Sequence, residues 1–363
     1  MPSLRGVPPC PKGPPMMNKY GIGLVFGKFY PFHNGHKELI QRALDECGIV
    51  LALVLSNEKE SIPAPVRTLW INRTMDDVRL ITRYHEDNLP VDYGNPELDL
   101  AHSKEIVKGI GHLRPDFLYT SEEYGDRIAG HLSDILNKTV VHRYVEPTTQ
   151  ISATEIRENI PMNWHALPGP TREWFVKDVV VSGPESSGTT TLARALAKHY
   201  GTTWVPEFGR LYSEAVGPHY QWASEDFEHI AREHQRLAAN LRSTCEAPLM
   251  IWDTNALATC MFHKLYLEQP PTDALIRYRD TQHPDLHIIA DHSTVPFEQD
   301  GTRLFEENRN WQLKYLVDGV DFDAGTMVIG THKRRMQIAT ATIDTILKWD
   351  LYEPEEAGKI ARG

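Results

Sequence analysis

The sequence predicts an α/β protein with two domains, each built on a parallel sheet. Three observations support this fold class. Short apolar runs typical of buried strands alternate with helical patterns, the 363 residues exceed what one core usually holds, and a glycine-containing turn follows the first strand of each half. A turn between a strand and a helix places free backbone N–H groups where they can bind an anion. The sequence therefore predicts one anion-binding site in each half.

The first half opens with the apolar run Ile22 to Phe26, which we interpret as a buried strand. The turn of residues 27–35 follows, and His36 to Glu46 carries apolar residues on one helical face. Ile49 to Leu55 is almost continuously apolar, as expected of a parallel strand that is covered on both faces. The later predicted elements are a helix over Val66–Arg83, strands over Phe117–Thr120 and Val140–Val145, and a short helix that starts within Ile151–Arg157.

A proline-containing stretch from Asn159 to Pro170 separates the two halves. The second half opens with the strand Val179–Ser182, the second glycine turn and a helix over Thr190–His199. The remaining predicted elements are helices over Ser224–Thr244 and Gln337–Trp349 and strands over Leu249–Trp252, Leu286–Ala290 and Thr326–Ile329. The predicted organisation is a disordered arm over 1–18, a first domain over 19–160, a linker over 161–177, a second domain over 178–350 and a tail over 351–363.

Composition narrows the classes of function. A net charge of −11 argues against a broad nucleic-acid surface, and no run of about 18 apolar residues exists to span a membrane. The residues from Met1 to Asn18 lack the apolar stretch of a signal peptide, and the four cysteines form no CxxC pair. We therefore expect a cytoplasmic protein with reduced thiols, no nucleic-acid partner and no membrane partner. The number of subunits stays open, and cores of this kind often form homo-oligomers.

The first turn reads Gly-Lys-Phe-Tyr-Pro-Phe-His-Asn-Gly-His over residues 27–36. In isolation, His33 and His36 fit metal ligands or buried core histidines. In this context His36 lies at a helix N-terminus, which attracts anions, and the i, i+3 spacing places both imidazoles on one side of a ligand. Lys28 adds a positive charge, Gly27 permits an unusual turn, and Gly35 lets a ligand approach the backbone.

These residue types suit the transfer of a nucleotidyl group. An acceptor phosphate attacks the α-phosphorus of ATP in line and pyrophosphate leaves, so no protein nucleophile is needed. Catalysis then consists of positioning and of stabilising charge on the phosphate oxygens, which imidazole and ammonium donors can do.

A second segment of the first half supports this interpretation. Ser152 and Thr154 offer hydroxyls at a predicted helix start, and Arg157 adds a guanidinium one turn later. We interpret them as a clamp for the leaving β- and γ-phosphates. The alternative is that Ser152 is only an N-cap and Arg157 only a surface charge. Arg67 has two interpretations as well, a phosphate contact in the same cleft or, as its position favours, a solvated helix face.

The two motifs together resemble the signature of the nucleotidyltransferase superfamily. The matching patterns are Gly-x-Phe-x-Pro-x-His-x-Gly-His, which includes Phe29, and Ile-Ser-x-Thr-x-x-Arg. The superfamily includes pantetheine-phosphate adenylyltransferases and cytidylyltransferases, so these motifs leave the acceptor open. The expected fold is a Rossmann-like nucleotidyltransferase sheet followed by a second parallel sheet.

The second turn has the spacing of a P-loop, with Gly183 and Gly188 five residues apart between a strand and a helix. The backbone N–H groups of such a loop form a cradle for a phosphate. Thr189 stands where a P-loop usually has lysine, and Thr190 stands where a hydroxyl binds Mg²⁺. Loss of a donor of this kind commonly costs on the order of 10²–10³ in rate. The residues expected to bind ATP here are Gly183, Glu185, Ser186, Ser187, Gly188, Thr189, Thr190 and Thr191.

Other residues of the second half fit a P-loop kinase. Asp253 ends a predicted strand, where Mg²⁺ or a substrate hydroxyl is handled. Glu207 and Arg210 are expected near the acceptor, and Asp300 and Arg303 belong to a predicted mobile lid. Taken singly, each is also explained as a strand-end acid, a turn residue or a surface ion pair. The candidates to replace the missing lysine are Arg194, Arg210 and Arg303.

The whole order of motifs resembles the NadR-type family of bifunctional nicotinamide-mononucleotide adenylyltransferases and ribosylnicotinamide kinases. The landmarks are the histidine turn, Ile151–Arg157, Glu185-Ser-Ser-Gly188, Pro206–Arg210, Asp253-Thr254 and the Asp-Gly-x-Arg of residues 300–303. The Glu-Ser-Ser-Gly loop behind a nucleotidyltransferase domain is the most distinctive of them.

The resemblance implies two reactions. The second domain would phosphorylate nicotinamide riboside with ATP and Mg²⁺, and the first would join nicotinamide mononucleotide to AMP, giving NAD and pyrophosphate. His33, His36 and Lys28 would contact the ATP phosphates together with Ser152, Thr154 and Arg157, and Asp253 would act near the riboside hydroxyl or Mg²⁺.

Some members also repress transcription through an N-terminal helix-turn-helix. That role is not expected here, because fewer than 20 residues precede the first predicted strand. Two alternatives remain beside the bifunctional enzyme. One is an adenylyltransferase whose P-loop domain, with Thr189, senses a nucleotide without kinase activity, and the other is a non-enzymatic regulator.

Overall fold

The computed structural model describes residues 20–90, 95–148, 151–299 and 306–349. By its internal contacts the chain divides into two compact units, Met1–Ile151 and Ser152–Gly363. Each unit contains one five-stranded sheet in which every strand pairing is parallel, so the predicted α/β class is confirmed.

The sheet of the first unit has the strand order β3-β2-β1-β4-β5. The central strand β1 pairs with β2 on one side and with β4 on the other, so the order of the strands reverses direction at β1. The open crevice of such a sheet lies at the carboxyl end of its central strands. The five strands are β1 (Ile22–Gly27), β2 (Ile49–Ser56), β3 (Leu80–Glu86), β4 (Phe117–Thr120) and β5 (Val141–Tyr144).

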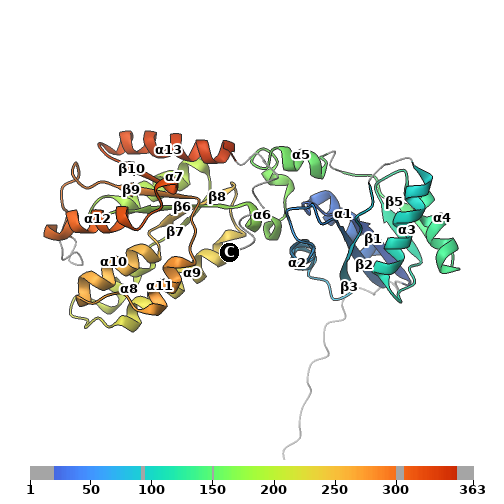
Figure 1. The fold of residues 1–363 in the computed structure, drawn as a ribbon, viewed down its shortest axis with the longest axis horizontal. Helices are drawn as coiled ribbons and strands as arrows, with labels where there is room; N and C mark the ends of the chain where they lie inside the picture. The colour runs from blue at the N-terminus through green and yellow to red at the C-terminus, as the bar shows by residue number, and fades with distance from the viewer. Residues whose placement is uncertain (1–19, 91–94, 149–150, 300–305, 350–363) are drawn as a thin grey trace, which may run out of the picture. The chain divides into compact units, whose positions relative to one another are not determined.

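Helices cover both faces of this sheet. Figure 1 shows α1 and α2 on one side of it and α3 and α4 on the other, in agreement with the contacts between these elements. Every residue of β2 after Ile49 is buried, which explains its almost continuous apolar pattern. The covering helices are α1 (Asn34–Glu46), α2 (Ala64–Met75), α3 (Pro96–Ile110) and α4 (Gly125–Leu136).

The helix predicted over Val66–Arg83 is wrong in its second half. The helix α2 ends where Asp76 adopts a left-handed conformation (φ 43°), and the strand β3 begins at Leu80. The strand β3 is an edge strand whose residues are all partly or fully exposed, so it lacks the alternation that identifies a strand in the sequence.

The sheet of the second unit has the order β10-β9-β6-β8-β7. All predicted strands of this half are present, and the short strand β7 is an addition that the sequence analysis missed. The five strands are β6 (Lys177–Ser182), β7 (Thr203–Val205), β8 (Leu249–Asp253), β9 (Leu286–Ala290) and β10 (Gly325–Val328).

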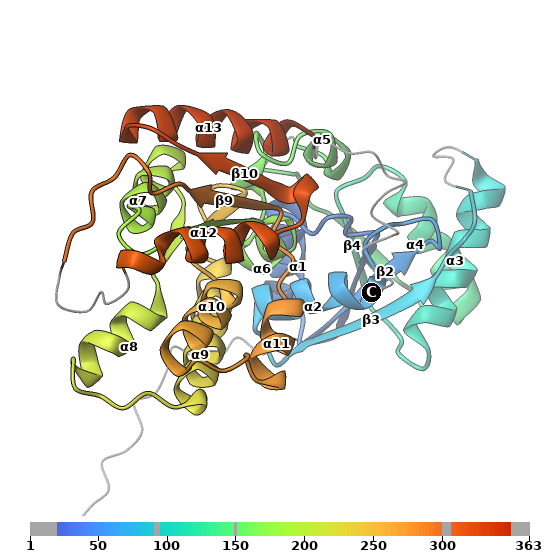
Figure 2. The same cartoon turned by 60° about the vertical axis from the view of Figure 1, so that its left-hand side comes forward.

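Helices also cover this sheet on both faces. Figure 2 shows α13 along β10 and β9 on one side and α12 and α10 on the other. The helix α7 packs against α13, and α9 packs against α10. The main helices are α7 (Thr189–Tyr200), α8 (Phe208–Val216), α9 (Ser224–Arg242), α10 (Ala256–Leu267), α11 (Asp273–Asp280), α12 (Arg309–Asp318) and α13 (His332–Trp349).

The segment that precedes β6 contains three ordered elements, of which the first lies at the end of the predicted first domain (19–160) and the other two lie in the predicted linker (161–177). The helix α5 (Ala153–Glu158), a 3₁₀ turn at Trp164–Ala166 and the helix α6 (Gly169–Phe175) precede β6. The Trp164 indole is buried and donates a hydrogen bond to the Cys245 carbonyl at 2.9 Å, which fixes this segment to the second unit. The predicted arm (1–18), the tail (351–363) and the lid residues Asp300 and Arg303 lie outside the described residues.

Cys47, Cys245 and Cys260 are buried free thiols. Within the part of the chain that the structure describes, no helix is both long and apolar enough to cross a membrane.

Candidate active sites

The first candidate site is the turn between β1 and α1, at the carboxyl end of the central strand. Gly27 is the last residue of β1, and His33 is the N-cap of α1. The unusual backbone conformation predicted for Gly27 belongs instead to Phe29, whose φ is 49°. A Cβ on Gly27 would meet only the Phe29 ring, at 3.9 Å, which is an ordinary contact.

The two histidines of the turn lie against each other. Their rings stack with centroids 3.7 Å apart. The Gly35 backbone N–H donates to Nδ1 of His33 at 3.1 Å, and the His33 backbone N–H donates to Nδ1 of His36 at 3.4 Å. Because each Nδ1 accepts a hydrogen bond, the proton of each neutral ring belongs on Nε2. The predicted pairing of the two imidazoles is therefore present, and each ring has an Nε2–H donor.

Burial keeps both rings uncharged at neutral pH. It lowers the pKa of His33 to about 4, and burial together with the nearby His33 lowers the pKa of His36. Phe29 and Phe32 are almost completely buried and pack against His36, with ring centroids at 4.9 Å and 6.0 Å from it. The Phe29 side chain therefore orients His36, and any contact of Phe29 with a ligand would be through its backbone.

Lys28 belongs to an ionic network that ties the turn to α2. Its Nζ lies 3.0 Å from Glu60, whose other oxygen lies 2.8 Å from Arg67. Arg67 also donates to the Lys28 carbonyl at 2.6 Å, and its side chain is 1% exposed. The interpretation of Arg67 as a solvated helix face was therefore wrong. The sequence signal that could have identified it is its place among buried residues, Ala64, Trp70 and Ile71, on α2.

Ser152, Thr154 and Arg157 lie on or next to α5. The Ser152 hydroxyl caps this helix by accepting from the Glu155 N–H at 3.1 Å, as the alternative interpretation had it. Arg157 donates to the Thr154 hydroxyl at 3.0 Å. By its contacts α5 belongs to the second unit, so the meeting of these three residues with the histidine turn stays a prediction.

The second candidate site is the turn between β6 and α7, which has the geometry of a P-loop. Gly188 caps α7 in a left-handed conformation (φ 81°), and Ser186 is also left-handed (φ 57°). A Cβ on Gly183 would lie 2.4 Å from the Ser187 hydroxyl and 2.7 Å from the Ala290 carbonyl, so only glycine fits there. Gly183 is therefore required by the lack of space for a side chain, and Gly188 is favoured by its backbone conformation.

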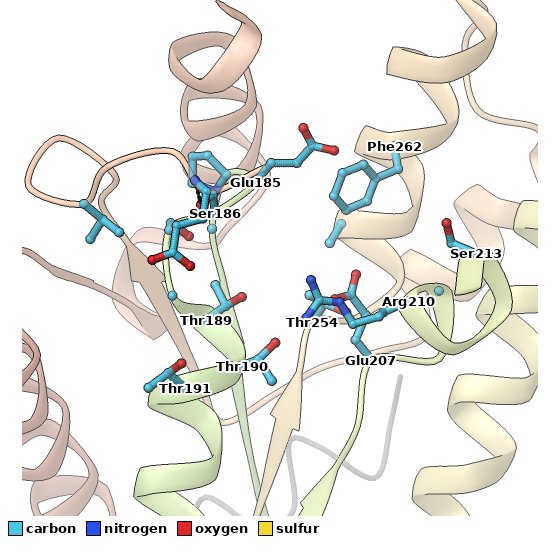
Figure 3. A pocket seen from close by; sticks show the side chains of 18 of the residues that line it. Glu185, Ser186, Thr189, Thr190, Thr191, Glu207, Arg210, Ser213, Thr254 and Phe262 are labelled. Carbon is cyan, nitrogen blue, oxygen red and sulfur yellow. Dashed lines mark hydrogen bonds between the residues drawn. The ribbon is translucent and has the colours of Figure 1, made fainter. Parts of the chain in front are cut away.

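The P-loop forms one wall of a cavity of about 560 Å³. Figure 3 shows Glu185, Ser186 and the three threonines of the loop on one side, and Glu207, Arg210, Ser213 and Phe262 on the other. Thr189, Thr190 and Thr191 form the first turn of α7, where free backbone N–H groups favour an anion. The predicted cluster of P-loop residues, Glu207 and Arg210 is thus brought together.

Asp253 ends β8 and is 1% exposed. Neither of its carboxylate oxygens has a hydrogen-bond partner of normal geometry among the described residues. Burial raises the pKa of Asp253 to about 6, although Thr190, Arg210 and Arg194 each act to lower it. A nearly buried carboxylate with unsatisfied oxygens is costly. Asp253 is not among the residues that line the cavity, but its side chain interacts with that of Thr190, which lines it.

Four aromatic residues of the same cavity were missed by the sequence analysis. They line the cavity, with Phe262 on the side opposite the P-loop (Figure 3), and the centroid of the Trp222 ring lies 5.2 Å from that of Phe227 and 5.4 Å from that of Tyr266. The signal available in the sequence was the i, i+4 pair Phe262 and Tyr266 on the helix that follows Asp253. The four residues are Trp222, Phe227, Phe262 and Tyr266.

The three candidates to replace the P-loop lysine differ in their placement. Arg194 and Arg210 both line the cavity, and Arg194 also stacks on the Trp204 ring with its Cζ 4.4 Å from the ring centroid. Arg303 lies outside the described residues. Among the described residues, no group of three His, Cys, Asp or Glu side chains gathers to hold a metal ion.

Both units match known families in sequence. Residues 24–159 match the cytidylyltransferase-like family, and residues 178–320 match the AAA domain family. These limits are compatible with a boundary near residue 160, whereas the internal contacts divide the chain after Ile151.

Two relatives are similar over most of the chain. It is 32% identical over 305 residues to the trifunctional NAD biosynthesis/regulator protein NadR of Escherichia coli (strain K12), covering 78% of this chain and 72% of that protein. It is 30% identical over 302 residues to the protein of the same name from Salmonella typhimurium (strain LT2), covering 78% of this chain and 71% of that protein.

Two solved structures have a similar fold. A NadR protein in complex with NR superposes with a TM-score of 0.69 at 20% identity, covering 89% of this chain and 94% of that one. A NadR protein in complex with NAD and AMP-PNP superposes with a TM-score of 0.68 at 21% identity, covering 92% of this chain and 97% of that one. At these identities the likeness concerns the arrangement of the two sheets and their helices.

Proposed function

The chain belongs to the NadR family of NAD biosynthesis proteins, and from this premise we propose that it is a bifunctional enzyme. Its first unit transfers the adenylyl group of ATP to nicotinamide mononucleotide, which gives NAD and pyrophosphate. Its second unit phosphorylates nicotinamide riboside with ATP, which supplies that mononucleotide. The proposal includes a cytoplasmic location.

The histidine turn supports the first reaction. An oxygen of the mononucleotide phosphate attacks the α-phosphorus of ATP, and the bond from that phosphorus to the bridging α–β oxygen breaks. The neutral Nε2–H groups of His33 and His36 donate to phosphate oxygens, and the ammonium of Lys28 offsets their charge. Neutral imidazoles suit this role because they donate a hydrogen bond without first losing or gaining a proton.

The P-loop cavity supports the second reaction. Its P-loop wall offers backbone N–H groups to the ATP phosphates, and aromatic rings also line the cavity. Nicotinamide riboside carries a flat pyridinium ring with a positive charge, which aromatic faces bind through stacking and cation–π attraction. This combination of a P-loop and aromatic rings around one cavity is the observation that carries the kinase proposal.

Thr190 and Asp253 fit a Mg²⁺ ion. Oxygen ligands suit this cation, which commonly takes one or two protein groups and completes its shell with water and substrate phosphates. The unpartnered oxygens of Asp253 beside the Thr190 hydroxyl offer such ligands. When bound, the ion neutralises charge on the transferring phosphoryl group. We also assign to Asp253, in its ionised form, the role of accepting the proton of a riboside hydroxyl.

Thr189 favours one alternative, in which the second unit binds a nucleotide but transfers no phosphoryl group. Product analysis separates the two functions. With ATP, Mg²⁺ and nicotinamide riboside, the proposal predicts the mononucleotide and then NAD. The alternative predicts NAD from the mononucleotide only. If neither substrate yields NAD and the riboside yields no mononucleotide, both enzyme functions are excluded.

A further inference from the structure

The buried Arg335 lies at the P-loop, where the sequence lacks a lysine. It belongs to α13 and is 3% exposed. Its Nη1 donates to the Ser187 carbonyl at 2.5 Å and lies 3.9 Å from a Cβ built on Gly188. Arg335 is also one of the residues that line the nucleotide cavity. The Arg335 guanidinium therefore lies next to Gly188, the residue that precedes Thr189, and Thr189 occupies the position of the usual P-loop lysine.

The hydrogen bonds of Arg335 go to uncharged acceptors. Besides the Ser187 carbonyl, it donates to the carbonyls of Gly330, at 2.9 Å, and Asp291, and to the Thr294 hydroxyl at 3.4 Å. No carboxylate among the described residues forms an ion pair with it. The Asp291 carboxylate is the nearest candidate, and it accepts from the N–H and the hydroxyl of Ser293 instead.

A buried cation without an ion-pair partner is unfavourable, because burial removes its hydration. Burial lowers the pKa of Arg335, and Asp291 opposes this only in part. A phosphate bound in the adjoining cavity would supply the missing counter-charge. The cavity wall carries the acids Glu185, Glu207 and Glu298 together with the cations Arg194 and Arg210, so Arg335 adds to the positive charge that attracts an anion there.

We propose that Arg335 supplies the fixed positive charge of the nucleotide phosphate site that Thr189 does not supply. The inference rests on the proposed function of the second unit, which requires ATP at the P-loop. Arg335 also fixes the backbone of the P-loop by its hydrogen bond to the Ser187 carbonyl. Its charge and its hydrogen bonds thus act on the same phosphate cradle.

A neighbouring arginine provides a matched control. Arg309 is also buried, and it donates to the Ser186 carbonyl at 3.3 Å and to the Val295 carbonyl at 3.2 Å. It therefore braces the same loop, but it is not among the residues that line the cavity. If both arginines only brace the loop, replacing either one should weaken nucleotide binding equally. If the charge of Arg335 attracts the phosphate, replacing Arg335 should weaken binding more than replacing Arg309.

The test is calorimetric titration of the full chain with AMP-PNP and Mg²⁺. The wild type is expected to show two binding sites, one in each unit. Arg335→Gln should weaken one of them about tenfold or more, as expected for a lost charged hydrogen bond, and leave the other unchanged. Arg309→Gln should weaken the same site distinctly less. Equal weakening by the two variants, or no weakening by Arg335→Gln, overturns the proposal.

Thr189→Lys keeps the proposal testable if Arg335→Gln does not fold. Because Arg335 already supplies a charge, we expect the added lysine to strengthen AMP-PNP binding less than about tenfold. A gain of about tenfold or more, as expected when a missing charged hydrogen bond is newly supplied, would show that the charge was absent and would overturn the inference. A wild type with only one binding site would instead refute the proposed function of the second unit.

Discussion

At the scale of single residues, both candidate sites contain polar groups whose pKa values burial has shifted from their ordinary values. In the first unit, burial makes the paired imidazoles of His33 and His36 neutral donors. In the second, burial makes the Asp253 carboxylate easier to protonate than a solvated one. These opposite directions have the same cause, because burial disfavours the charged form of any group.

Removal of the His36 ring should stop adenylyl transfer. His36→Ala removes a donor whose position is fixed by His33 and by two phenylalanine rings, and we expect pyrophosphate release from ATP and nicotinamide mononucleotide to fall about 10²-fold or more. His112→Ala, which changes an exposed histidine after α3, is the control and should leave the rate unchanged. A near-normal rate for His36→Ala would exclude this ring from the reaction.

The pH dependence of the kinase reaction should report Asp253. Because its pKa is raised to about 6, the carboxylate is protonated below that pH and ionised above it, and only the ionised form binds Mg²⁺ or accepts a proton. The kcat/KM for nicotinamide riboside should therefore rise between pH 5 and 7 with a midpoint near 6. Asp253→Asn should abolish the reaction, and a pH-independent wild-type kcat/KM would contradict this role.

The residues that sequence reasoning placed correctly are those whose chemistry coincides with a backbone signal. His33, His36, Gly183 and Gly188 each lie at a strand-to-helix turn, which the apolar patterns on both sides identify. Arg67 and Arg335 could not be recognised in this way. Each is a charged residue that packing buries, and its charge alone suggests an exposed position; for Arg67 the apolar neighbours on the same helical face were the one contrary signal.

At the scale of elements, the strands and helices that hold the sites could be predicted from apolar runs. The strands β1, β2, β6, β8 and β9 are central and mostly buried, and each was located within about two residues. The strands that sequence reasoning missed, β3 and β7, lie at the sheet edges, where solvent allows polar residues and the alternation weakens.

The P-loop should tolerate no side chain at its first glycine. In Gly183→Ala the new Cβ would collide with the Ala290 carbonyl, which cannot move without disturbing β9. We expect riboside phosphorylation to be lost and the second unit to be destabilised by about 1–3 kcal/mol. Adenylyl transfer by the same variant should persist, because the first unit is unaffected.

Gly130→Ala is the matched control for this substitution. Gly130 lies in α4, and a Cβ there would meet nothing within 4 Å. This change should leave both reactions intact and stabilise the first unit by up to about 1 kcal/mol, since alanine favours a helix. Thermal unfolding of the two variants measures the difference, and a fully active Gly183→Ala would refute the proposed geometry of the loop.

At the scale of the whole molecule, the chain consists of two units with separate cores, and each has a glycine-containing turn at the carboxyl end of its central strand. We therefore interpret the protein as two catalysts on one chain, the second producing the acceptor that the first consumes.

The most direct test measures both reactions in the wild type, His36→Ala and Asp253→Asn, supplied with ATP, Mg²⁺ and either the riboside or the mononucleotide. We expect the wild type to form NAD from both substrates, His36→Ala to convert the riboside to mononucleotide without NAD, and Asp253→Asn to form NAD from the mononucleotide alone. If either variant loses both reactions while remaining folded, the turns do not act as two separate active sites.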